Sequence, residues 1–240
     1  MAYANGPKIV TDGLVLCLDA ANRKSYPGSG TSWTDLSGNG NNGSLVNGVG
    51  YSSNNGGSLV FDGSNDYISL ASPSDRYAWT PSGNGNNYMT IDIWVKSTDG
   101  SGRFFSKPWN GSGWYNYGMG NGTFYLVTST TITKNFSNIS TGNWENATFV
   151  VNPTQFAVYR NGSINSSFSN HNLTSNLPGT GGNLNLPLAL MTLYPYGVWA
   201  GNTGYSMSGQ LGIFKFYNRV LSPNEVQQNY NALKGRYGLT

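Results

Sequence analysis

Short apolar runs, each closed by a cluster of Gly, Asn and Ser, are the feature of this sequence that most limits its fold. In residues 89–95, Met, Ile, Ile and Val occupy alternate positions, so they share one face of an extended chain and belong in a core. This period of two between turn-forming residues is typical of antiparallel strands. Strands are expected over 13–19, 58–62, 66–71, 88–96, 103–107, 114–119, 123–128, 146–151, 155–160, 186–193 and 208–217.

Turn-forming residues indicate where the chain reverses between these strands. Asn152-Pro153-Thr154 separates two expected strands, and Asn161-Gly162 follows at the next reversal, so two consecutive hairpins are predicted. The stretches 37–56 and 80–87 are rich in Gly, Asn and Ser and are predicted to be loops.

One helix is predicted near the C-terminus. Ser222 at the N-cap, Pro223 at the first helical position and Glu225 three residues after the serine form the pattern of a capping box. Gly235 is expected to end the helix. The apolar stripe on its buried face consists of Val226, Tyr230 and Leu233.

The composition favours an all-β fold over the other fold classes. Charged residues make up 10% of the 240 residues and aromatic residues 14%. A disordered chain has the opposite balance, and a helical bundle is rich in Ala, Glu, Lys and Leu. The net charge of +3 comes from scattered Lys and Arg residues, so no stripe for binding nucleic acid is expected.

The beginning of the chain and its one cysteine bear on domain organisation and location. Residues 1–7 lack the basic and apolar regions of a signal peptide, and no apolar stretch approaches a membrane span. Cys17 lies in an apolar run and is expected to be a buried free thiol. We expect an N-terminal extension or arm over residues 1–12 and one domain over residues 13–240.

Several segments together resemble a known superfamily in their order and spacing. They are GLVLCLD (13–19), WTDLSGNGNNG (33–43), LVFDGSNDYI (59–68), IDIWV (91–95) and GIFKFYNRVLSPNEV (212–226). The chain resembles the laminin-G-like branch of the concanavalin A-like lectin/glucanase superfamily. This resemblance implies a jelly-roll sandwich of two antiparallel sheets with one short C-terminal helix.

The opening segment MAYANGPKIV (1–10) carries a second resemblance. It is similar to the start of stand-alone lectin-like structural proteins of tailed bacteriophages. This implies a non-catalytic protein on the virion surface, as a head decoration or fibre-like component, made in the host cytoplasm. The implied partners are capsid or tail proteins, host-surface glycans and further copies of the chain. The alternative is a purely structural protein that stabilises a capsid or forms an oligomer without binding sugar.

The loop from Asp35 to Gly43 is the best candidate for a metal site. A carboxylate followed by Gly and Asn supplies oxygen ligands on a backbone that can wrap a cation, and related domains hold calcium near this loop. The expected ligands are Asp35, Asn39 and Asn42, although the family often has His where Asn42 stands. The alternative is that these side chains satisfy the amides of the loop.

The segment from Asp62 to Asp66 joins two expected strands and resembles a hairpin of the same family. Its two carboxylates can cap the turn or lend an oxygen to a cation, and turn capping is the simpler interpretation.

Aromatic residues in polar loops are the candidates for sugar binding, because sugars stack their apolar faces on aromatic rings. The candidates flanked by Gly, Pro and Asn are Trp109, Tyr194 and Tyr196. The same residues would equally serve a protein interface, in which Trp and Tyr are enriched.

Catalysis is not expected. Glucanases of this fold use paired carboxylates, but Glu145 and Glu225 are the only glutamates and neither has an acidic partner at the spacing required. His171, the only histidine, lies in a polar loop without a nucleophile or metal-binding pattern around it.

Overall fold

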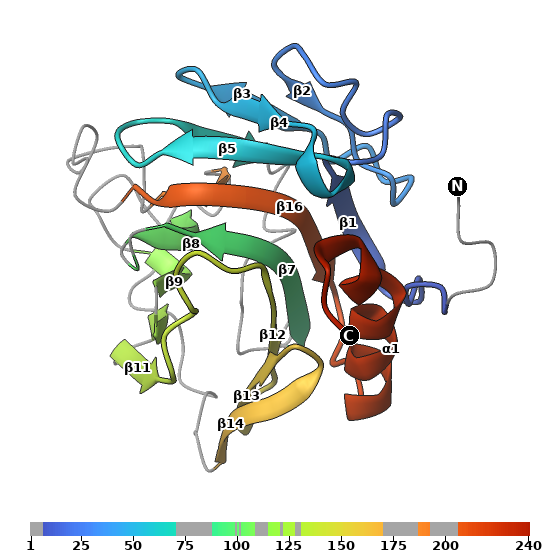
Figure 1. The fold of residues 1–240 in the computed structure, drawn as a ribbon. Coiled ribbons are helices and arrows are strands. Elements are labelled where there is room, and N and C mark those ends of the chain that lie inside the picture. The colour runs from blue at the N-terminus through green and yellow to red at the C-terminus, as the bar shows by residue number, and fades with distance from the viewer. Residues whose placement is uncertain are drawn as a thin grey trace.

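Two antiparallel sheets form a sandwich in the computed structural model (Figure 1). The structure describes residues 7–70, 88–98, 100, 102–108, 115–120, 122–127, 131–169, 187–192 and 206–240. Within these residues each sheet has eight strands. The all-β class and the two-sheet jelly-roll architecture expected from the sequence are confirmed.

The first sheet, called sheet A, is built from strands in both halves of the chain. They are β1 (Leu14–Asp19), β4 (Gly50–Ser52), β5 (Ser58–Asp62), β7 (Met89–Ser97), β12 (Glu145–Val151), β13 (Gln155–Arg160), β14 (Ser163–Ser169) and β16 (Ser208–Tyr217). Their spatial order is β14-β13-β12-β7-β16-β5-β4, and β1 pairs with the second half of β16.

The second sheet, called sheet B, contains the other strands of the described residues. They are β2 (Ser32–Trp33), β3 (Gly43–Val46), β6 (Tyr67–Leu70), β8 (Arg103–Pro108), β9 (Tyr115–Gly120), β10 (Thr123–Val127), β11 (Thr131–Asn135) and β15 (Leu188–Leu190). Their spatial order is β11-β10-β9-β8-β15-β6-β3-β2.

The core lies between the two sheets and follows the alternation seen in the sequence. Ile91 and Ile93 of β7 are buried in it, as expected from their shared face. Phe105 of sheet B meets Phe149 of sheet A edge to face, with ring centroids 5.9 Å apart. Such aromatic contacts between sheets add to the free energy of burying apolar area.

Part of the outer face of sheet A is also buried, where the C-terminal helix packs on it (Figure 1). Asp92 and Lys215 form an ion pair of 2.9 Å there, with both side chains fully buried. Asn146 and Asn229 each donate a hydrogen bond to the same carboxylate, at 2.7 and 3.0 Å. A buried charge needs such partners, and Asp92 has three of them.

The two predicted hairpins are confirmed. The Asn152 side chain accepts hydrogen bonds from the backbone N–H groups of Thr154 and Gln155 in the first turn. Asn161 and Gly162, in the second, have φ of 49° and 75°. These angles fit a two-residue turn of type I′, the turn that Asn-Gly favours.

The predicted helix is confirmed as α1 (Pro223–Leu233), and its capping box is present. Gly235 does not end the helical path, because the chain tightens into a 3₁₀ turn over Lys234–Tyr237 and ends at Gly238, with φ of 73°. This turn places Tyr237 on Trp94, with ring centroids 4.2 Å apart. None of the described helices has the length and apolar character needed to span a membrane.

The prediction of a loop over residues 37–56 was wrong. This stretch contains β3, β4 and a 3₁₀ turn at Asn54–Gly56. Both strands are short and are held by pairing with β6 and β5, which a local pattern does not reveal. The polar strands β11 and β14 were missed for the same reason, and residues 80–87 lie outside the described residues.

Candidate functional site

The Asp35 loop brings a nearly buried carboxylate, 8% exposed, against the outer edge of β1. Asp35 Oδ1 accepts hydrogen bonds from the backbone N–H groups of Cys17 and Ser37, at 2.9 and 2.8 Å. Its Oδ2 accepts from the Ser37 hydroxyl at 2.7 Å and from the Asn41 N–H at 3.0 Å. An ionised carboxylate has about four acceptor positions, so these donors fill them all.

The other two expected calcium ligands lie in the same loop and also bind protein groups. Asn42 Oδ1 accepts a hydrogen bond from the Asp35 N–H at 2.9 Å. The Asn39 amide donates to Val15 O at 3.2 Å and to the Ser37 hydroxyl at 2.9 Å. The structure thus brings Asp35, Asn39 and Asn42 together, but a cation bound by Asp35 or Asn42 would have to displace the donors that occupy the side-chain oxygens of these two residues. Calcium at this loop stays a prediction.

The loop supplies hydrogen-bond partners to the free edge of β1, a role that the sequence pattern does not indicate. The Cys17 carbonyl accepts a hydrogen bond from the Leu36 N–H at 2.8 Å, and its N–H is bound by Asp35. Val15 O accepts from Asn41 Nδ2 at 2.8 Å. Covering a strand edge in this way prevents pairing with other chains.

Cys17 is a buried free thiol, as expected. Burial raises the pKa of this thiol to about 12. The thiolate form is therefore suppressed near neutral pH, and Cys17 does not supply a nucleophile.

The turn from Asp62 to Asp66 differs from the Asp35 loop. Asp66 is 2% exposed, and its Oδ2 accepts a hydrogen bond from the Asp62 N–H at 3.0 Å. Its Oδ1 is buried without a hydrogen-bond partner. Asp62 Oδ1 accepts from the Ser64 N–H at 2.7 Å. Burial raises the pKa of Asp66 to about 6, and the neighbouring Asp62 carboxyl group adds to the rise.

The three residues proposed for sugar binding, Trp109, Tyr194 and Tyr196, lie outside the described residues. Their role stays a prediction.

The outer face of sheet B carries a row of small residues that pair across neighbouring strands. The row consists of Ser32, Ser44, Ser69, Ala189, Ser106 and Gly118. Their sequence neighbours Ile68 and Phe105 belong to the core, so the row faces away from it. Ser32 and Ser44 are exposed, Ser69 is half-buried and the other members are buried. In the sequence, the row corresponds to a Ser, Ala or Gly at one outward-facing position of each strand.

The two glutamates are engaged in separate ion pairs. Glu145 is bound by the guanidinium of Arg160, with Nη2 2.6 Å from Oε2. Arg219 Nη2 lies 2.6 Å from Glu225 Oε1, and this contact lowers the pKa of Glu225 to about 2. In the part of the chain that the structure describes, no group of three or more His, Cys, Asp or Glu side chains is arranged to hold a metal. His171 lies outside that part.

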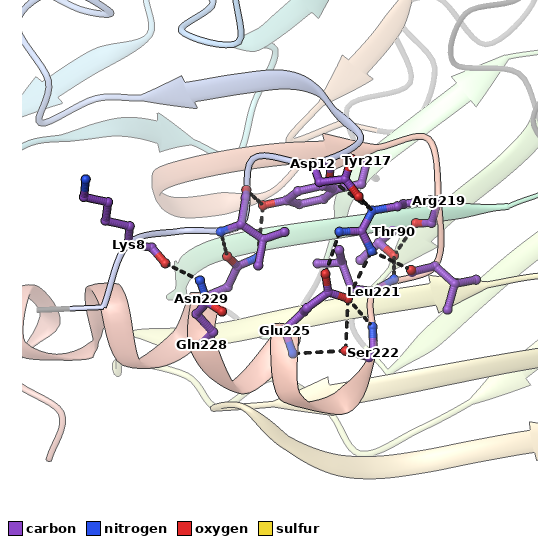
Figure 2. A network of polar contacts seen from close by, with 12 residues as sticks. Lys8, Asp12, Thr90, Tyr217, Arg219, Leu221, Ser222, Glu225, Gln228 and Asn229 are labelled. Carbon is purple, nitrogen blue, oxygen red and sulfur yellow. Dashed lines mark hydrogen bonds and ion pairs between the residues drawn. The ribbon is translucent and has the colours of Figure 1, made fainter.

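The described half of the expected N-terminal arm is attached to its own domain (Figure 2). Val10 N–H donates to Asn229 Oδ1 at 2.8 Å, and its carbonyl accepts from the Tyr217 hydroxyl at 3.0 Å. Lys8 O accepts from Gln228 Nε2 at 2.8 Å. These contacts join the segment to α1 and β16, while residues 1–6 lie outside the described residues.

Comparison with known families and structures gives a consistent result. A family model described as Concanavalin A-like lectin/glucanases superfamily matches residues 62–227, which is more than half of the chain. No curated protein sequence matches the chain.

Solved structures with a similar fold include sugar-binding and toxin domains. Domain 4 of AbnA, an extracellular GH43 arabinanase from Geobacillus stearothermophilus in complex with arabinotriose, has a TM-score of 0.58 and 19% identity over 90% of this chain and 98% of that one. The binding domain of Paraclostridial mosquitocidal protein 1 has a TM-score of 0.67 and 18% identity over 95% of this chain and 56% of that one.

A third similar structure is the binding domain of botulinum neurotoxin DC in complex with rat synaptotagmin II. It has a TM-score of 0.64 and 15% identity over 93% of this chain and 52% of that one. The chain therefore spans about half the length of the toxin binding domains that it matches. At these identities the likeness establishes the fold alone.

Proposed function

Given that the chain belongs to the concanavalin A-like lectin/glucanase superfamily, we propose that it is a glycan-binding module without catalytic activity. One similar structure, domain 4 of the arabinanase, is a complex with arabinotriose and matches this chain over almost its whole length. That complex supports an oligosaccharide as the class of ligand.

The observation that carries the proposal is the row of serines on the outer face of sheet B. Ser32, Ser44 and Ser69 pair in register across three adjacent strands, and the first two are exposed. A hydroxyl both donates and accepts hydrogen bonds, as the hydroxyls of a sugar do. Aromatic side chains would add stacking, which is the role that the sequence predicts for Trp109, Tyr194 and Tyr196.

The ion pairs of the two glutamates support the part of the proposal that excludes catalysis. Each is held by an arginine, and they belong to different elements: Glu145 to β12 and Glu225 to α1. Retaining glycosidases need two carboxyl groups about 5–5.5 Å apart with one of them protonated. A glutamate with a pKa of about 2 is a poor proton donor near neutral pH.

A glycan array with the purified chain tests the proposal. Ser44→Trp fills the exposed end of the row, whereas Ser163→Trp, at an exposed position of β14 in the other sheet, is the matched control. We expect Ser44→Trp to lose binding and Ser163→Trp to keep it. Equal binding by both variants, or no glycan bound by the unchanged chain, would contradict the proposal. Trp109→Ala and Tyr196→Ala then test the stacking residues.

The proposal extends to a place on a virion surface, as a head decoration or fibre-like component made in the host cytoplasm. The support is the similarity of residues 1–10 to phage structural proteins and the surface rich in Gly, Asn and Ser. Many copies on a particle would strengthen weak single contacts with host glycans. Immunogold labelling of purified particles, with antibodies raised against the chain, tests this. Unlabelled particles from a lysate that contains the chain would reject it.

A second candidate is protein contact without sugar binding, either in a capsid or between copies of the chain. One similar toxin domain was solved in complex with a protein, synaptotagmin II. In this chain Ile164, on strand β14 at the end of sheet A, is 56% exposed. Ile164→Lys should abolish an oligomer seen by analytical ultracentrifugation if this candidate is right, while glycan binding would be unaffected.

A further inference from the structure

The turn between β5 and β6 holds two carboxylates for which the described residues supply no positive partner. Five ion pairs involving side chains are formed within the described residues, and neither Asp62 nor Asp66 belongs to any of them. Asp92, the other deeply buried aspartate, has Lys215 at 2.9 Å. Asp66 is buried to nearly the same degree without such a partner.

Within the described residues, each carboxylate of the turn uses one oxygen for the backbone, and its other oxygen accepts no hydrogen bond. Asp66 Oδ2 accepts from the Asp62 N–H, and Asp62 Oδ1 accepts from the Ser64 N–H. Asp66 Oδ1 is buried without a hydrogen-bond partner. A buried charged oxygen without a partner is costly, so its presence in a folded protein needs an explanation.

We propose that this turn binds one calcium ion through Asp66 Oδ1 and the second carboxylate oxygen of Asp62. Calcium takes hard oxygen ligands in flexible geometries and completes its shell with carbonyl groups and water. Asp62 is exposed, so one of the two ligands of the ion lies at the surface. Magnesium demands a nearly ideal octahedron of ligands and gives up its water reluctantly, so calcium suits a site with two carboxylates on a turn.

The location of the turn gives the ion a structural effect. It carries the chain from sheet A to sheet B, because β5 belongs to one and β6 to the other. Asn47 Nδ2, from the connection between β3 and β4, donates to Asn65 O within the turn at 2.9 Å. A ligand that binds only the folded chain stabilises it in proportion to its binding free energy, so calcium should raise the melting temperature.

The experiment is a calcium titration of the metal-free full chain by calorimetry, with melting curves in calcium, magnesium and chelator. Asp66→Asn and Asp62→Asn keep the size of each side chain and remove its charge. Asp35→Asn is the matched control, because it makes the same change in the saturated carboxylate of the other loop. The change of Asp62 falls on an exposed side chain, so this variant should fold even if another does not.

We expect one calcium ion per chain, a higher melting temperature in calcium than in magnesium, and the loss of both effects in Asp62→Asn and Asp66→Asn. Asp35→Asn should melt lower but keep its rise with calcium. The proposal is overturned if the unchanged chain binds no calcium, if magnesium raises the melting temperature equally, or if Asp35→Asn alone removes the calcium effect. The last result would assign the ion to the Asp35 loop.

Discussion

Asp35 and Asp66 are both buried carboxylates in turns rich in Gly, Asn and Ser, yet their surroundings differ. Four donors from the Asp35 loop and the edge of β1 surround the Asp35 carboxylate. Asp66 has one backbone donor and an adjacent carboxyl group. A carboxylate in a Gly- and Asn-rich turn can therefore bind a cation directly only where the fold leaves one of its oxygens without a donor.

The difference comes from what each turn lies against. The Asp35 loop runs beside an open strand edge, where the N–H of Cys17 needs an acceptor. The Asp62–Asp66 turn crosses between sheets, and the edge groups of β5 and β6 are already paired with neighbouring strands. Asp35 therefore acts as a structural acceptor, and Asp66 keeps a free oxygen.

Replacing Asp35 by Ala should have the largest effect. It leaves the buried N–H groups of Cys17 and Asn41 without an acceptor, and each such group costs about 1–3 kcal/mol. We expect the free energy of unfolding to fall by about 3 kcal/mol or more, measured by urea denaturation. Asp62→Ala, at an exposed position, is the control, and both variants are measured in chelator so that calcium does not contribute. A fall below about 1 kcal/mol would show that the loop does not depend on Asp35.

Changes of Asp to Asn at the two positions should have opposite signs in chelator. Asp35→Asn replaces one acceptor oxygen by an NH2 donor that faces other donors, so it should destabilise the fold by about 1–2 kcal/mol. Asp66→Asn removes a buried charge beside Asp62 and should stabilise it by about 1 kcal/mol. Chemical denaturation of both variants in the same buffer measures the two effects. If both variants change the free energy of unfolding in the same direction, the proposed difference between the two carboxylates is wrong.

Glu225 is a third carboxylate to compare, and the Arg219 guanidinium donates to both of its oxygens. Arg219 lowers its pKa to about 2 from 4.5, so its contribution to stability is present above about pH 4.5 and is lost as the pH falls through about 2. Glu225→Gln should reduce the acid-induced fall of the free energy of unfolding, by at most about 1 kcal/mol for a partly exposed pair. An unchanged acid dependence in denaturation curves would contradict this.

Replacing Asn47 by Gly should have the smallest effect. Glycine keeps the positive φ of 61° at this position and removes only the hydrogen bond to Asn65 O. We expect a loss of about 0.5 kcal/mol in the free energy of unfolding with calcium present. Calcium titration should give an affinity close to that of the unchanged chain, and a complete loss of binding would make Asn47 itself part of the site.

Much of the fold was predictable because its signals are local. The capping box of Ser222 and Glu225 and the Asn161-Gly162 turn depend on residues within a few positions of one another. The alternation in β7 identified its core face, but it did not show that Asp92 on the other face would be buried under α1 with Lys215. That burial depends on a helix more than a hundred residues away in the chain.

The candidate sites were less predictable than the fold. The sequence identified Asp35, Asn39 and Asn42 as neighbours in one loop, and the structure brings them together. It did not show that the Cys17 N–H would occupy an Asp35 oxygen, that the Asp35 N–H would occupy the Asn42 oxygen, or that the Asn39 amide would donate to Val15 O. The serine row on sheet B was missed because its members come from segments that are far apart in the chain and meet only by strand pairing.

The all-β class, the hairpins, the capped helix and the family follow from the sequence, because period, turn chemistry and capping act over a few residues. Tertiary structure decided which sheet each strand joins and how many donors reach each buried carboxylate. Asp35 and Asp66 have similar sequence surroundings, but only Asp35 lies beside a strand edge with unpaired N–H groups. Hydrogen-bond satisfaction depends on groups brought close by folding, so no local pattern reports it.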